Sequence, residues 1–155
     1  MVSAVWVVTM VEASERGEND MSTSKNVPSA LRKWFVFHFW ADILVAIPLF
    51  IAPVLLLEFL GWKHVDPYTA RLTAAALFGI GIESLLGRNE DADSFRTMLM
   101  LKVIWSGTAV TGIAWTLVEA PQGRPFFGFV FLAVFVAFHI VWQYWRRKMA
   151  LPAKD

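Results

Sequence analysis

The chain of 155 residues contains no cysteine. This absence excludes disulfide bonds, thiol redox chemistry, thiolate metal sites and cysteine nucleophiles. Charged residues are also scarce, at 17% of the sequence, whereas soluble domains usually contain about 25%. The formal net charge of +1 gives no electrostatic support for binding to polyanions, so we expect no nucleic-acid partner.

Apolar residues are abundant, at 57% of the chain, whereas about 45–50% is usual for soluble domains. A soluble protein of this length would have too little interior to bury so much apolar surface. The apolar residues also occur in long runs, and about 20 of them in succession can cross a bilayer as a helix. The sequence therefore predicts an all-α integral membrane protein whose partner is the lipid bilayer.

Four apolar runs predict four transmembrane helices. The predicted spans are residues 34–60, 67–86, 95–118 and 125–145. The first is longer than a hydrocarbon core of about 30 Å requires, and we expect Pro48 and Pro53 to kink it because each removes a backbone hydrogen bond. Short connections predict antiparallel neighbours, so the expected fold is an antiparallel bundle of four transmembrane helices.

The two ends of the chain are expected to lie outside this membrane domain, which we place at residues 31–148. Residues 2–11 are apolar but short, and they lack the basic residues that precede the apolar part of a signal peptide. We interpret residues 1–30 as an N-terminal tail that is either disordered or the product of a wrongly assigned start, and residues 149–155 as a C-terminal tail.

The distribution of Lys and Arg predicts the orientation in the membrane. Ten of these residues lie on the side that holds both termini and the second loop, and three lie on the other side. Cytoplasmic loops are enriched in positive charge, so we expect both termini in the cytoplasm and a multi-pass protein of the plasma membrane. Trp142 and Trp145, just before Arg146, are typical of an aromatic belt at the cytoplasmic interface.

Polar residues inside the spans are the informative ones, because a bilayer makes them costly. Counted from the cytoplasmic end of each span at about 1.5 Å per residue, the ionisable residues lie roughly 6–12 Å deep. The exception is Glu58, which lies in the outer half of the first span, near its end. Four helices should therefore contribute to one polar layer. The members of this predicted polar layer are His38, Asp42, Glu83, Lys102, Ser106, His139 and Gln143.

The faces of these helices suggest how the polar layer is packed. On the second span, Ala75, Gly79 and Gly87 recur every four residues with Glu83, and small residues allow membrane helices to approach closely. On the third span, Ala109 shares a face with Lys102 and Ser106. Because an isolated buried charge is costly, we predict that Lys102 pairs with Asp42, with Glu83 or with both.

The same polar residues could instead form a chemical site. His38, His139, Asp42 and Glu83 could together ligate a metal ion, but Lys102 would repel a cation, so we predict no metal. Ser84 or Ser106 with His139 could form a nucleophile and base, but no motif supports the pairing. The sequence identifies neither a catalytic residue nor a cofactor.

The order of these features resembles a known family. Leu60-Gly61-Trp62 is followed by Asp66-Pro67, by Arg71, by an Ala/Gly-rich helix over residues 74–81, and finally by an aromatic and basic end over residues 142–147. This resembles the DoxX-like group of small four-helix membrane proteins across residues 30–148. Members named for a quinone-linked oxidoreductase subunit imply an accessory role, and no functional residue carries over.

Three functions follow as hypotheses. The first is a non-enzymatic accessory or subunit-like membrane protein. The second is a small transporter or binding module for a proton, an ion or an apolar molecule, with a water-accessible cavity at the polar layer. The third is a membrane enzyme acting on lipid or quinone, with a lateral opening that exposes His38 or His139 to lipid. A homo-oligomer or a larger membrane complex fits each of them.

Overall fold

The structure is a computed structural model that describes residues 27–119 and 125–150. In these ranges every regular element is a helix, and four helices are long and apolar enough to cross a membrane. The elements, in order, are α2 (Ser29–Ile51), α3 (Pro53–Phe59), α4 (Pro67–Leu86), the short 3-10 helix η1 (Gly87–Asn89), α5 (Ala92–Glu119) and α6 (Phe126–Ala150). The predicted all-α bundle of four antiparallel spans is thus confirmed.

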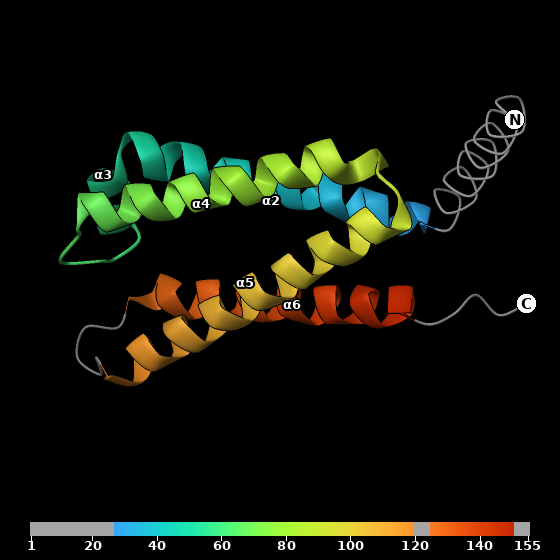
Figure 1. Ribbon diagram of the computed structural model, residues 1–155. Helices are drawn as coiled ribbons and strands as arrows, with labels where there is room; N and C mark the ends of the chain where they lie inside the picture. Colours follow the sequence, from blue (N-terminus) through green and yellow to red (C-terminus); the bar gives the residue numbers. More distant parts are fainter. Residues whose placement is uncertain (1–26, 120–124, 151–155) are drawn as a thin grey trace, which may run out of the picture.

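The helices are arranged as two pairs (Figure 1). α2 packs along α4, and α5 packs along α6. The beginning of α2, the end of α4, the beginning of α5 and the end of α6 lie together at one end of the molecule. We call this end the closed end, and it holds the larger of the two apolar clusters.

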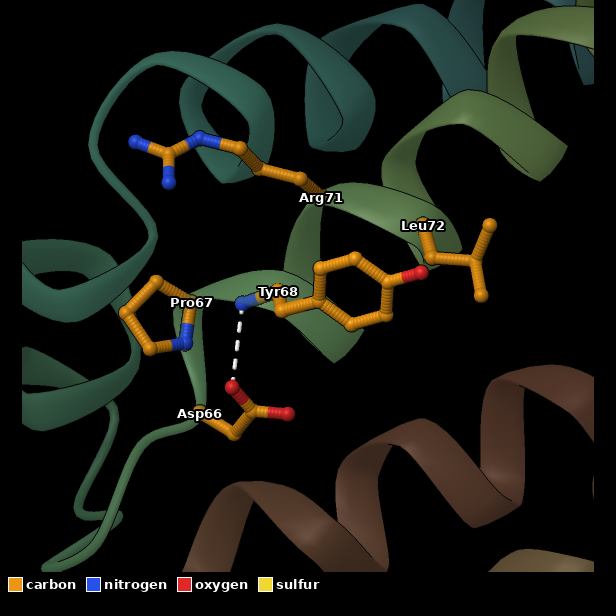
Figure 2. Close-up of a pocket in the computed structure, with 5 residues that line it drawn as sticks. All are labelled: Asp66, Pro67, Tyr68, Arg71 and Leu72. Atoms are coloured by element: carbon orange, nitrogen blue, oxygen red, sulfur yellow. Dashed lines mark hydrogen bonds between the residues drawn. The ribbon is translucent and has the colours of Figure 1, made fainter.

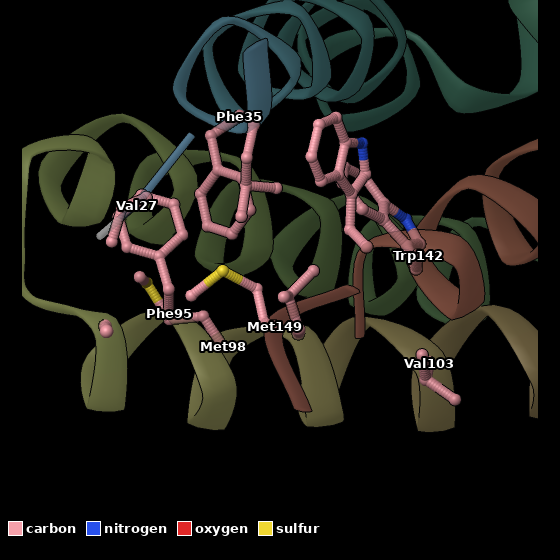
Figure 3. Packing of buried hydrophobic residues seen from close by; sticks show 11 residues of the cluster. Val27, Phe35, Phe95, Met98, Val103, Trp142 and Met149 are labelled. Carbon is pink, nitrogen blue, oxygen red and sulfur yellow. The ribbon is translucent and has the colours of Figure 1, made fainter. Parts of the chain in front are cut away.

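The cluster at the closed end joins both helix pairs, as Figure 3 shows for Phe35, Phe95 and Trp142. Phe35 of α2 contacts Phe95 of α5 at 4.7 Å and Trp142 of α6 at 5.9 Å between ring centroids. A second, smaller cluster lies between α2 and α4, with Leu49 and Leu77 among its buried residues. The two pairs are therefore joined mainly at the closed end.

The first predicted span is two helices rather than one kinked helix. α2 ends at Ile51 and α3 begins at Pro53, which takes the first helical position because it has no N–H to donate. The break leaves the Phe50 carbonyl outside the α2 hydrogen-bond ladder, and Arg71 Nε donates to it at 3.2 Å. The first span is therefore interrupted at Pro53, one of the two prolines expected to bend it, and is corrected from a single kinked helix to two helices.

The predicted tails are also corrected where the structure describes them. Val27 is buried in the core and α2 already begins at Ser29, so residues 27–30 belong to the membrane domain. At the other end, Met149 is buried and α6 continues to Ala150. The remaining tail residues, 1–26 and 151–155, lie outside the described residues.

The small-residue face predicted for α4 is not the one that packs within the chain. Ala75 and Gly79 are exposed, and a Cβ on Gly79 would meet nothing within 4 Å. A Cβ on Gly81, in contrast, would lie 2.9 Å from Asp42 Cβ. The buried face of α4 consists of Ala70, Ala74, Leu77, Ile80, Gly81 and Ser84.

Gly87 does meet a neighbour, because a Cβ there would collide with the flexible side chain of Met98. Its φ of −75° keeps it in the right-handed region, so α4 runs on into η1 at this residue.

Gly61, at the end of α3, has a φ of +95° that favours glycine. Ala109 of α5 is half-buried.

Candidate functional site: a buried network around Lys102

Lys102 is the centre of the polar layer. It lies on α5 and is 1% exposed. Its Nζ donates to Ser84 Oγ at 2.6 Å and to Glu83 Oε2 at 3.1 Å. Both acceptors come from the last turns of α4, so this one side chain links the two helix pairs.

Aromatic rings complete the surroundings of the ammonium group. Lys102 Nζ lies 4.8 Å from the centroid of the Phe35 ring and 5.7 Å from that of Trp142. The negative face of an aromatic ring attracts a cation, and the attraction is stronger where water is excluded. The charge of Lys102 is thus balanced by a carboxylate, a hydroxyl group and two rings of the same chain.

His38 and Asp42 form the α2 side of the network. They are four residues apart on one face, and His38 Nδ1 lies 3.2 Å from Asp42 Oδ2. This separation is within ion-pair range, but the atoms are not in hydrogen-bond geometry, and Asp42 Oδ2 has no hydrogen-bond partner among the described residues. His38 Nδ1 also lies 3.4 Å from Ser84 Oγ.

The hydroxyl group of Ser84 indicates which way these bonds run. Its single hydrogen is donated to the Ile80 carbonyl at 2.7 Å, so Ser84 Oγ can only accept from Lys102 and from His38. His38 Nδ1 is then the protonated nitrogen of its ring, an assignment that follows from the network. Asp42, His38, Ser84, Lys102 and Glu83 thereby form one continuous cluster from α2 to α5.

A second group of polar residues adjoins this cluster on α6. Ser106 Oγ donates to the Lys102 carbonyl at 2.7 Å and lies 2.9 Å from His139 Nδ1. His139 Nε2 lies 3.5 Å from the side-chain nitrogen of Gln143. Because Ser106 donates its only hydroxyl hydrogen to the Lys102 carbonyl, His139 Nδ1 must be the donor to Ser106 Oγ. His139 Nε2 is then an acceptor for the side-chain nitrogen of Gln143.

All seven residues of the predicted polar layer are therefore found in two adjoining groups. Of the two carboxylates expected to pair with Lys102, Glu83 does so, whereas Asp42 lies beside His38. Ser84 was not included in the predicted layer, although it bridges two of its members, His38 and Lys102. Two features of the sequence could have identified Ser84. It is adjacent to Glu83, and serines in membrane helices usually bond to the carbonyl of the preceding turn, here Ile80.

Two carboxylate oxygens of the network lack hydrogen-bond partners. Asp42 Oδ2 and Glu83 Oε1 are the buried side-chain oxygens without one in the described ranges. The Glu83 side chain as a whole is 30% exposed, whereas that of Lys102 is 0% exposed. Over residues 27–119 and 125–150, no three His, Cys, Asp or Glu side chains converge as metal ligands would.

Two surface cavities, both wide open to the outside, lie at opposite ends of the molecule and not at the network. One has a volume of about 560 Å³ and is lined by Asp66, Pro67, Tyr68, Arg71 and Leu72, as Figure 2 shows. There Asp66 caps α4 by accepting from Tyr68 N at 3.0 Å. Its hydrogen bonds, first of all the one from the Thr69 hydroxyl, lower the pKa of Asp66 from the ordinary value of 3.8.

The other cavity, at the closed end, has a volume of about 260 Å³. Its lining residues are Arg32, Lys33, Val36, Arg88 and Asn89, and we call it the basic cavity. Neither cavity includes a residue of the polar layer. Of the two rings that a lipid-facing opening was expected to expose, that of His38 is buried at 5% exposed, whereas His139 is half-buried.

Comparison of the chain with protein-family models, with curated proteins and with solved structures gives no match.

Proposed function

We propose that this chain is a small multi-pass protein of the plasma membrane with a non-enzymatic, accessory or subunit-like role, and with both termini in the cytoplasm. The use of the buried charge supports this proposal. Lys102 Nζ is bonded to Glu83 and Ser84 and faces the rings of Phe35 and Trp142. A charge satisfied in this way fixes the relative positions of helices and leaves little for a substrate to bind.

The remaining surface supports the same role. Large apolar side chains are exposed along α2, α4, α5 and α6, as expected for helices covered by lipid or by other membrane helices. Ala75 and Gly79 form an exposed small-residue face on α4 that a neighbouring subunit could approach closely. The resemblance to DoxX-like proteins, which implied an accessory role, remains a prediction.

Orientation can be tested directly, because the native chain has no cysteine to interfere. Single substitutions Lys63→Cys and Arg147→Cys place a thiol at exposed positions at opposite ends of the molecule. A maleimide that cannot cross membranes should label Lys63→Cys in intact cells and Arg147→Cys only after the membrane is opened. The reverse pattern would overturn the proposed cytoplasmic termini.

The accessory role can be tested by native mass spectrometry of protein extracted in a mild detergent. We expect a stoichiometric complex with another membrane polypeptide, together with no ion flux when the purified chain is reconstituted in liposomes. A chain that is monomeric on extraction and conducts protons or ions in liposomes would contradict the proposal.

A second function is favoured by one observation, the two unpartnered buried oxygens of Asp42 and Glu83. Carboxylates in membrane proteins commonly mark proton or ion pathways, and these two lie at the ends of the cluster that runs through His38, Ser84 and Lys102. A proton transporter built on these carboxylates would dissipate a pH gradient imposed across liposomes, and Asp42→Asn would abolish this flux. The accessory function predicts that Asp42→Asn liposomes and wild-type liposomes are equally tight.

A further inference from the structure

The basic cavity gathers positive charge at the level where a lipid headgroup would lie. Arg32 and Lys33 are the fourth and fifth residues of α2, and Arg88 lies in η1 directly after α4. Both elements adjoin the ends of membrane-spanning helices at the closed end. Three of the five lining residues carry positive charge, and none of the five is acidic.

The position of the cavity is set by a contact between distant parts of the chain. Arg32 Nη1 donates to the Arg88 carbonyl at 2.5 Å, and Nη2 donates to the Glu90 carbonyl at 3.3 Å. The Arg32 guanidinium group also lies 5.2 Å from the centroid of the Phe95 ring. Arg32 therefore positions η1 against α2, and the cavity follows from that arrangement.

The other two cations have donors to offer a ligand. Lys33 is exposed, and its ammonium group has no partner in the described part of the chain. Arg88 bends back to the Leu85 carbonyl through Nη1 at 2.6 Å, which leaves most of the five guanidinium N–H groups unused. Lys and Arg together bind phosphate oxygens well, with Arg supplying a fork of donors and Lys a point charge.

Three acidic residues follow the basic cavity in sequence, and none of them lines it. The first, Glu90, accepts from Arg32 through its backbone carbonyl, and its carboxylate forms no ion pair in the described ranges. Asp91 Oδ1 accepts from Ser94 N at 2.7 Å at the start of α5. The hydrogen bonds from the backbone and side chain of Ser94 lower the pKa of the Asp91 carboxyl group. Asp93 pairs with Arg96 at 2.5 Å. The carboxylates of Asp91 and Asp93 are thus engaged with α5, outside the cavity lining.

The surface beside the cavity favours a lipid over a free anion. Val36 lines the cavity one turn after Lys33, and Trp40 follows one further turn along the same face of α2. Trp40 is 56% exposed. A phosphate bound at Lys33 and Arg88 would therefore have an apolar helix face directly below it, where acyl chains can lie.

We infer that the basic cavity binds the phosphate of an anionic phospholipid headgroup, with Lys33 and Arg88 as ligands and Arg32 as the residue that positions them. This inference requires only that the helices span a membrane, and it is independent of the proposed accessory role.

Native mass spectrometry and thermal unfolding with added phosphatidylglycerol, and with phosphatidylcholine for comparison, test the inference on delipidated protein in detergent. The double variant Lys33→Gln/Arg88→Gln should bind phosphatidylglycerol about tenfold to thirtyfold more weakly, since each basic residue near an anionic headgroup contributes substantially. The matched control Arg146→Gln/Arg147→Gln removes the same charge from exposed residues at the same end. It should change the affinity by less than about threefold, because these residues do not line the cavity.

Equal losses in the two double variants would overturn the inference, since they would indicate a diffuse attraction to surface charge. Displacement of the lipid by inorganic phosphate at matched ionic strength would also overturn it, in favour of a free-phosphate site. Lys33→Gln alone guards against misfolding, because this side chain is exposed and its loss should still weaken binding at least about threefold. An unchanged affinity in that variant would refute Lys33 as a ligand.

Discussion

Removing the charge of Lys102 should destabilise the bundle more than removing the charge of Glu83, and removing both should cost less than the two losses added together. The Lys102 side chain is 0% exposed and that of Glu83 is 30% exposed. Lys102→Met leaves the Glu83 carboxylate unpaired and Ser84 Oγ without its best donor. Breaking a buried pair from one side costs about 3–5 kcal/mol, and the partial exposure of Glu83 favours the lower value.

Glu83→Gln should cost less, about 1–2 kcal/mol, because an amide oxygen still accepts from the ammonium group and Ser84 remains bonded to it. In the double variant no buried charge is left unpaired, so we expect a loss of about 2–3 kcal/mol. These values imply a coupling energy of about 2 kcal/mol between the two side chains. Ordinary hydrogen bonds between membrane helices give an average of about 0.6 and a maximum of about 1.7 kcal/mol.

The assay is reversible unfolding in mixed micelles with increasing denaturing detergent, followed by circular dichroism for the wild type, both single variants and the double variant. The pair Asp93 and Arg96 supplies the control cycle, because these side chains are 78% and 55% exposed. Its coupling should stay below about 0.5 kcal/mol. Additive losses for Lys102 and Glu83 would refute the reasoning, since they would mean that the ammonium group does not depend on this carboxylate.

Two further predictions concern α4. Gly81→Ala should destabilise the bundle by about 1–3 kcal/mol, because its Cβ would lie 2.9 Å from Asp42 Cβ. Gly79→Ala should be neutral or stabilising in the same unfolding assay, because a Cβ there would meet nothing within 4 Å. Equal effects of the two substitutions would contradict the packing of this face. Because hydrogen bonds lower the folded pKa of Asp66 below 3.8, its contribution to stability is fully present above that value and is lost as the pH falls through the lower, folded pKa. Asp66→Asn should therefore flatten the acid limb of the unfolding curve against pH, and an unchanged limb would show that the cap contributes nothing.

The sequence was sufficient to predict the number of spans and, apart from Ser84, the members of the polar layer for clear physical reasons. Long apolar runs bounded by Lys and Arg define membrane helices in any arrangement. His38 and Asp42 share a face by helical spacing alone. Depth counting then brings Lys102 and His139 to the same level, because neighbouring helices are antiparallel. None of these inferences requires knowing how a helix is rotated about its own axis.

Rotation is what the sequence could not determine. α4 has two faces with small residues, one through Ala75 and Gly79 and one through Ala74 and Gly81. Both allow close approach, and the choice depends on the bulk of Asp42 on α2, which fits only against a residue without a side chain. The break at Ala52 is similar, because Arg71 stabilises it from a position far along the chain.

The way the two helix pairs meet limits what the polar layer can do. The smaller apolar cluster lies between α2 and α4, and α6 buries the smallest share of its apolar stretch. The pairs are therefore held together mainly at the closed end, where Lys102 of α5 is bonded to Glu83 and Ser84 of α4. Away from the closed end the two helix pairs are loosely packed against each other. Lys102 therefore cannot release Glu83 and Ser84 during a transport cycle without loosening the contact between the two pairs. Of the two carboxylates that have an oxygen without a hydrogen-bond partner, Glu83 is the one that holds Lys102. Asp42 is therefore the carboxylate that could bind a proton and leave the bond between Lys102 and Glu83 intact.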